Sequence, residues 1–138
     1  MTTTLQGDGP LIVVDDSPHD IEILERCFAR SDLAAHYRLQ AVGTGQGLLD
    51  HMTQVEAGAE PMPSIVLLDI NMPGMDGFEA LRVLRSREPF KDLPTVVFVT
   101  NSDDPRDAER AQNLGAAFAE KFGDLQEGIR FFNDLIDR

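Results

Sequence analysis

The chain has 138 residues, of which 42% are hydrophobic and 26% are charged, as expected for one folded domain and unlike a disordered or fibrous protein. Its net charge of -12 repels a phosphate backbone, so we expect no binding to nucleic acid. The single cysteine, Cys27, cannot form an internal disulfide, and apolar runs such as "IVLL" and "VVFV" are too short to span a membrane. These features predict a cytoplasmic protein without a membrane segment.

Short apolar runs alternate along the chain with longer segments that have helical spacing. Ser17 before Pro18 and Asp104 before Pro105 each combine a helix N-cap with proline at the first helical position. The expected strands are 11–14, 37–42, 64–68, 95–99 and 116–120, and the expected helices are about 17–30, 44–57, 76–87, 104–114 and 124–137.

Alternation of strands and helices predicts an α/β fold with a doubly wound, five-stranded parallel sheet and helices on both faces. The near-continuous apolar runs at 11–14, 65–68 and 96–99 suit central strands, so we expect the flavodoxin-like strand order 2-1-3-4-5. One domain over residues 1–138 is expected, with a flexible segment at 1–9.

Three aspartates follow two strands that this order places side by side. Asp15 and Asp16 end the first strand and Asp69 ends the third, so their carboxylates are expected at one edge of the sheet. At ~5 Å and an effective dielectric constant of ~20, each charged pair repels by roughly 3 kcal/mol. A divalent cation relieves this repulsion, and hard oxygen ligands favour Mg²⁺.

Two hydrogen-bond donors lie at the ends of the fourth and fifth strands. Thr100 closes the fourth strand and Lys121 follows the fifth. A phosphoryl group on Asp69 would need such donors opposite the metal, and an aspartate nucleophile is known chemistry for phosphoryl transfer. Each residue alone has an ordinary structural explanation, but their shared position at strand ends favours a phosphoryl site.

Four stretches in order, "VDDS", "LLDINMPGMDG", "VTN" and "GAAFAEK", resemble the receiver domain of two-component response regulators. The resemblance covers essentially the whole chain. It implies that Asp69 takes a phosphoryl group from a sensor histidine kinase. It also implies that Asp16 and the backbone carbonyl of Asn71 ligate Mg²⁺ together with Asp69, while Asp15 helps to position the ion.

The same resemblance gives roles to residues of the last two strands. Thr100 and Lys121 bind the phosphoryl oxygens, and Phe118 matches the aromatic side chain that moves inward when the threonine is drawn to the phosphate. Thr100 and Phe118 are therefore the expected switch. Phe122 departs from the pattern because proline, joined by a cis bond, usually follows the lysine in this family.

The resemblance implies a signalling domain rather than an enzyme. No output domain is expected after the last helix, so the downstream target is expected to be another, unidentified protein. The missing proline and the long connection "TQVEAGAEPMPS" are similar to stand-alone receivers, some of which pair with phytochrome-type kinases.

Two alternatives to a phosphorylated receiver remain open. One is a degenerate receiver that binds partners without phosphate, although such proteins typically lose a site residue. The other is a phosphohydrolase of the haloacid-dehalogenase type, which requires an aspartate at the position of Asn71.

The last helix has more apolar residues than one sheet-covering stripe needs. Phe131 and Leu135 form a second stripe, and we expect them to mediate a homodimer through helix 104–114, strand 116–120 and helix 124–137. A single wide buried stripe is the alternative. The residues expected in the first, buried stripe are Leu125, Ile129, Phe132 and Ile136.

Overall fold

A computed structural model describes residues 5, 7–102 and 104–135. The strands are β1 (Leu11–Val14), β2 (Leu39–Val42), β3 (Ile65–Leu68), β4 (Val96–Thr100) and β5 (Ala117–Glu120). The α-helices are α1 (Pro18–Ala29), α2 (Gly45–Glu56), α3 (Gly77–Arg85), α4 (Pro105–Asn113) and α5 (Leu125–Asn133). Two short 3-10 helices, η1 (Asp32–Ala35) and η2 (Glu88–Phe90), lie in the connections.

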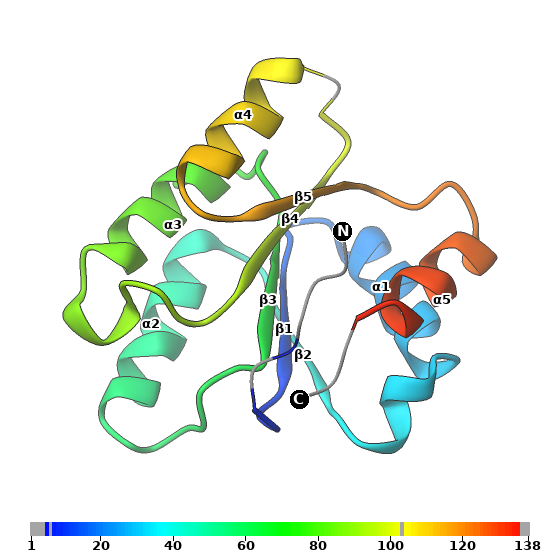
Figure 1. Ribbon diagram of the computed structural model, residues 1–138, viewed down its shortest axis with the longest axis horizontal. Helices are drawn as coiled ribbons and strands as arrows, with labels where there is room; N and C mark the ends of the chain where they lie inside the picture. The colour runs from blue at the N-terminus through cyan, green and yellow to red at the C-terminus, as the bar shows by residue number, and fades with distance from the viewer. Residues whose placement is uncertain (1–4, 6, 103, 136–138) are drawn as a thin grey trace.

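The five strands form one parallel sheet in the order β2-β1-β3-β4-β5, which confirms the predicted α/β fold and strand order. Figure 1 shows α2, α3 and α4 on one side of the sheet and α1 and α5 on the other. Val14 pairs with Val42 on one side and with Leu68 on the other, and Leu68 pairs with Phe98. This register brings the carboxyl ends of the central strands to one edge.

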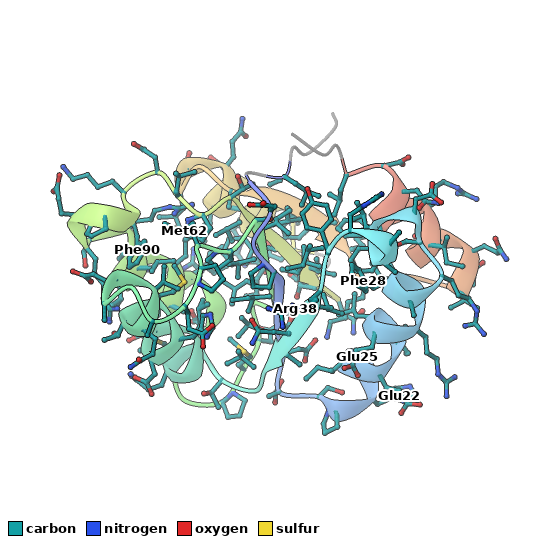
Figure 2. The ribbon with its side chains drawn as sticks, turned by 90° about the horizontal axis from the view of Figure 1, so that it is seen from below. Glu22, Glu25, Phe28, Arg38, Met62 and Phe90 are labelled. Carbon is teal, nitrogen blue, oxygen red and sulfur yellow. The ribbon has the colours of Figure 1, made fainter. Side chains whose placement is uncertain are left out.

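The central strands are apolar throughout because both of their faces are buried. Alternate residues of β1 enter different hydrophobic clusters: Ile12 and Val14 face α2 and α3, whereas Val13 faces α1 and α5. Figure 2 shows Phe28 and Phe90, one from each cluster, on opposite sides of the sheet.

Two predicted helix starts agree with the structure. The Ser17 hydroxyl accepts a hydrogen bond from the Asp20 N–H at the start of α1, and the Asp104 carboxylate accepts one from the Arg106 N–H at the start of α4. Both caps precede a proline at the first helical position, which requires no N–H there. These caps fix where the chain turns from each site strand into its helix.

Part of the segment expected to be flexible, residues 1–9, is packed instead. Leu5 is fully buried in the cluster beneath α1 and α5. The hydroxyls of Tyr37 and Ser64 donate hydrogen bonds to the Gly7 carbonyl. The short polar sequence gave no sign of these contacts, because their partners lie far along the chain.

Helix α5 is rotated relative to the expected stripes. Leu125 is 37% exposed, whereas Leu135 is only 6% exposed and belongs to the core beneath α1. The reason is Gly128, where an added Cβ would lie 2.2 Å from the Cys27 Sγ, so the helix turns this residue and Phe132 toward α1. Leu135, just after the C-cap of α5, packs in the same cluster as Phe132. Ile136 lies outside the described residues.

None of the helices that the structure describes is long and apolar enough to cross a bilayer.

Candidate functional site

The three predicted carboxylates meet at the carboxyl edge of the sheet. The N–H of Asp15 donates to the Val42 carbonyl at 3.1 Å and the N–H of Asp69 donates to the Val14 carbonyl at 2.9 Å, so strand pairing continues into the site. One carboxylate oxygen from each of Asp15, Asp16 and Asp69 lies within 4.8 Å of the others. The structure therefore brings together the residues that the sequence placed more than fifty positions apart.

These carboxylates fit a small divalent cation. Asp15 is 2% exposed and Asp69 is 6% exposed, while Asp16 is open to solvent. Burial raises the pKa of Asp69, the Lys121 ammonium lowers it, the charge of Asp15 raises it, and a hydrogen bond with the Thr100 hydroxyl lowers it; the net pKa is raised. The ionised Asp69 is thus destabilised by its surroundings, and an additional positive charge would relieve it. Oxygen ligands with one solvent-facing side match the preference of Mg²⁺ for retained water.

Lys121 carries the positive charge of the site. Its Nζ atom lies 2.6 Å from Asp20, 3.0 Å from Asp15 and 3.5 Å from Asp69, each distance being to an Oδ2 atom. Burial lowers the pKa of Lys121, but the hydrogen bonds to Asp20 and Asp15 and the charge of Asp69 outweigh it and raise the pKa above its usual value. The ammonium remains protonated and neutralises part of the cluster.

Asp20 is the site residue that the sequence reasoning missed. It lies in the first turn of α1 and is brought to the site by that helix. An acidic residue at this position usually complements the helix dipole, which hid its contact with Lys121. The spacing of the sequence gives no signal for this contact, because its partner lies 101 positions further along the chain.

Thr100 and Phe118 occupy adjacent strands. Thr100 is fully buried, its hydroxyl bonds with Asp69, and its Oγ1 accepts a hydrogen bond from the Ser102 N–H at 3.4 Å. Phe118 pairs in register with Phe98 and is partly buried against the cluster beneath α3 and α4. The Thr100 hydroxyl therefore lies at Asp69, and Phe118 lies on β5 two positions before the residue that pairs with Thr100.

The loop after β3 folds back onto the acceptor. An added Cβ at Gly77 would lie 2.2 Å from the Asp69 carbonyl oxygen, and the Gly77 N–H donates to the Ile70 carbonyl at 2.8 Å. Gly74, with φ of 77°, makes the turn possible. Asn71, an exposed residue, lies in this loop two positions after Asp69.

Phe122 links the lysine to α5. Among the residues that the structure describes, Leu93–Pro94 is the cis peptide bond, so Lys121–Phe122 is trans. The Phe122 ring lies 5.1 Å from Phe131 and 6.3 Å from Phe132, centroid to centroid. The phenylalanine that replaces the usual proline is thus part of an aromatic cluster on α5.

Comparison with known proteins agrees with this geometry. Residues 11–121 match the family model described as the response regulator receiver domain. The chain is 29% identical over 111 residues to the two-component response regulator ORR1 of Oryza sativa, covering 80% of this chain and 48% of that protein. It therefore spans about half the length of this curated relative.

Solved structures give the same result. Response regulator RPA3017, from red light signaling of R. palustris, superposes with a TM-score of 0.76 and 29% identity, covering 90% of this chain and 89% of that one. The bacteriophytochrome response regulator AtBRR superposes with a TM-score of 0.74 and 26% identity, covering 94% of each chain.

Proposed function

Because the chain belongs to the response regulator receiver domain family, we propose that it accepts a phosphoryl group on Asp69 from a histidine kinase. An oxygen of the Asp69 carboxylate forms a bond to phosphorus as the bond between phosphorus and the donor imidazole nitrogen breaks. The observation that carries this proposal is the convergence of three carboxylates with the Lys121 ammonium and the Thr100 hydroxyl.

Mg²⁺ is the proposed cofactor. Asp16, Asp69 and the backbone carbonyl of Asn71 would hold the ion, and Asp15, whose Oδ1 accepts a hydrogen bond from the Ser17 N–H at 2.9 Å, would help to position it. When bound, Mg²⁺ supplies positive charge to the phosphoryl oxygens. The buried, mutually repelling carboxylates support this assignment.

Thr100 and Lys121 are the proposed ligands of the phosphoryl oxygens. Both side chains lie beside the Asp69 carboxylate. Movement of the Thr100 hydroxyl toward a phosphoryl group would change the space next to β5, and Phe118 would respond to it. We assign Thr100 and Phe118 as the switch that alters partner binding.

The proposed kinase is of the phytochrome type. This proposal is supported by the likeness to RPA3017, a response regulator in red light signaling, and to AtBRR, a bacteriophytochrome response regulator. The downstream partner is proposed to be another protein. The chain acts as a signalling domain whose chemistry is limited to its own phosphorylation and dephosphorylation.

A homodimer through α4, β5 and α5 is the proposed assembly. Strand β5 is an edge strand, and an open groove of about 1160 Å³ runs along it between α4 and α5. Phe118 and Phe131 line this groove, and Leu135 forms part of its wall despite being mostly buried. A second copy would cover these apolar side chains and the small residues of β5. Sedimentation of the wild type and of Phe131→Glu tests this interface, which a monomeric wild type would exclude.

Phosphorylation is tested with a small phosphodonor. In the presence of Mg²⁺, acetyl phosphate should add the mass of one phosphoryl group to the intact protein, and Asp69→Asn should abolish the addition. Absence of labelling in the wild type would favour a degenerate receiver. Multiple turnovers with simple phosphate esters would favour the phosphohydrolase alternative, which Asn71 disfavours because that chemistry requires an aspartate there.

A further inference from the structure

Lys121 is shared unequally among its carboxylate partners. Its Nζ lies 2.6 Å from Asp20 but 3.5 Å from Asp69, the proposed acceptor. The shorter distance is that of a charge-assisted hydrogen bond, whereas the longer one is an ion pair without ideal contact. Asp15, at 3.0 Å, is the second partner, so the ammonium is held more closely by α1 and by the end of β1 than by the proposed acceptor.

Asp20 does not serve the usual local role of an acidic residue at its position. It is the third residue of α1, from where an acidic side chain normally accepts the N–H of the N-cap residue. Here the Ser17 N–H donates to the Asp15 carboxylate instead. The Asp20 carboxylate instead accepts a hydrogen bond from a lysine 101 positions away.

The side chain of Lys121 can move without its backbone. The Lys121 N–H donates to the Thr100 carbonyl at 3.0 Å, which ties the main chain to the end of β4. A cavity of about 30 Å³ adjoins the side chain and is lined by both Asp20 and Lys121. This volume exceeds what one water molecule needs, so the Lys121 side chain is not tightly packed on the side that faces α1.

We propose that Asp20 is a positioning residue that holds the Lys121 ammonium against α1 and competes for it with the phosphoryl group on Asp69. The proposal rests on the function proposed above. In the unphosphorylated protein the hydrogen bond to Asp20 keeps Lys121 from full contact with Asp69. Phosphorylation must stretch or break that bond, so Asp20 lowers the phosphorylated fraction reached at a given donor concentration.

Asp20→Asn tests the competition because it keeps the shape of the side chain and removes its charge. At a limiting acetyl phosphate concentration, the ratio of phosphorylated to unphosphorylated protein should rise about threefold to tenfold, as expected for loss of one partly buried charged hydrogen bond. Glu25→Gln is the matched control, because this residue is an exposed carboxylate on the same helix (Figure 2) and its loss gives the same change in net charge. Its ratio should equal that of the wild type.

A double-mutant cycle separates positioning from simple charge repulsion. If Asp20 acts through Lys121, adding Asp20→Asn to Lys121→Ala should change the ratio by less than about twofold. An equal increase in both backgrounds would overturn the proposal, because Asp20 would then repel the phosphoryl group directly. Asp20→Glu retains the carboxylate, so its ratio of phosphorylated to unphosphorylated protein should be lower than that of Asp20→Asn and close to that of the wild type.

The unphosphorylated protein offers a test that does not require labelling. Exchange of the Lys121 ammonium protons with water, measured by ¹⁵N nuclear magnetic resonance, should be about fivefold faster in Asp20→Asn than in the wild type or in Glu25→Gln. Unchanged exchange would contradict the positioning role of Asp20 even if Asp69 is phosphorylated. Faster exchange in a protein that takes no phosphoryl group would support the positioning role of Asp20 and reject the proposed function, so the two failures are distinguishable.

Discussion

The carboxyl ends of β1 and β3 and the face formed by α4, β5 and α5 differ in how tightly their side chains are held. Every residue of β1 and β3 is buried, and the aspartates that follow these strands continue the sheet hydrogen bonds. In contrast, the two ends of β5 are exposed, and among the described residues of α4 only Ala111 is buried.

The two regions are also held by different interactions. The Arg110 guanidinium lies 4.0 Å from the centre of the Phe78 ring and connects α4 to α3 by a cation–π contact, which is worth about 1 kcal/mol. The site is instead fixed by paired backbone and by ion pairs around Lys121. We infer that a phosphoryl group meets a rigid site, whereas the face that responds to it is rearranged at small cost in free energy.

The largest expected difference is in core substitutions. Leu68→Ala in β3 should lower the free energy of unfolding by about 2–5 kcal/mol, since it removes a fully buried side chain. Phe118→Ala in β5 should cost about 1–2 kcal/mol, because this larger ring is only partly buried. Urea denaturation of both variants measures the two values. Equal losses would break the comparison between the two regions.

The next effect concerns the crowded loop beside the acceptor. Gly77→Ala should destabilise the protein by about 1–3 kcal/mol, because the new methyl group would collide with the Asp69 carbonyl oxygen. It should also slow labelling by acetyl phosphate, since the acceptor is displaced. Gly43→Ala is the control, because an added Cβ there meets nothing within 4 Å. A stable, normally labelled Gly77→Ala would show that the site is less rigid than its packing indicates.

A smaller effect follows from the raised pKa of Asp69. At pH values between the pKa of Asp69 in the unfolded chain and its higher pKa in the folded protein, the native state binds more protons than the unfolded state. The free energy of unfolding therefore falls as the pH rises through this range. Without Mg²⁺, Asp69→Asn should therefore be more stable than the wild type at pH 7. The gain should vanish as the pH falls below 3.8, the ordinary value for this carboxyl. Thermal unfolding at several pH values measures it, and a variant less stable at pH 7 would contradict the assignment.

The most specific test of coupling is Thr100→Ala. This variant should still accept a phosphoryl group, because Asp69 and Lys121 are retained. Phosphorylation should then alter amide hydrogen exchange in α4 and β5 much less than it does in the wild type, since the hydroxyl that senses the phosphoryl group is absent. An undiminished change in those elements would place the coupling elsewhere.

Fold and site were predictable from the sequence to the extent that they depend on strand ends. Continuously apolar β1, β3 and β4 could only be central, and this order brings Asp15 and Asp69 together. The role of Asp20 was not predictable, because it depends on the direction that the Lys121 side chain takes. Its sequence position alone indicated an ordinary helix-dipole residue.

The rotation of α5 was unpredictable for a similar reason. Apolar spacing alone gave Leu125 a buried place and Leu135 an exposed one. In the structure Leu125 is exposed and Leu135 is buried, because Gly128 packs closely against Cys27 of α1, about a hundred residues earlier in the chain. Within its own helix Gly128 is destabilising, but its lack of a side chain allows α5 to pack against α1.

The origin of the site in separate strand ends has a consequence for the synthesis of the protein. Asp20 and Lys121 are 101 positions apart, and Lys121 reaches its place only after β5 has paired with β4. A chain emerging from the ribosome therefore carries the acceptor aspartate long before it carries a complete site. Contacts between residues so far apart in sequence form slowly, because the long intervening loop must first be closed. On the proposed function, we therefore expect phosphorylation to require a chain in which β5 has paired with β4, and a copy truncated before Lys121 should take up no phosphoryl group.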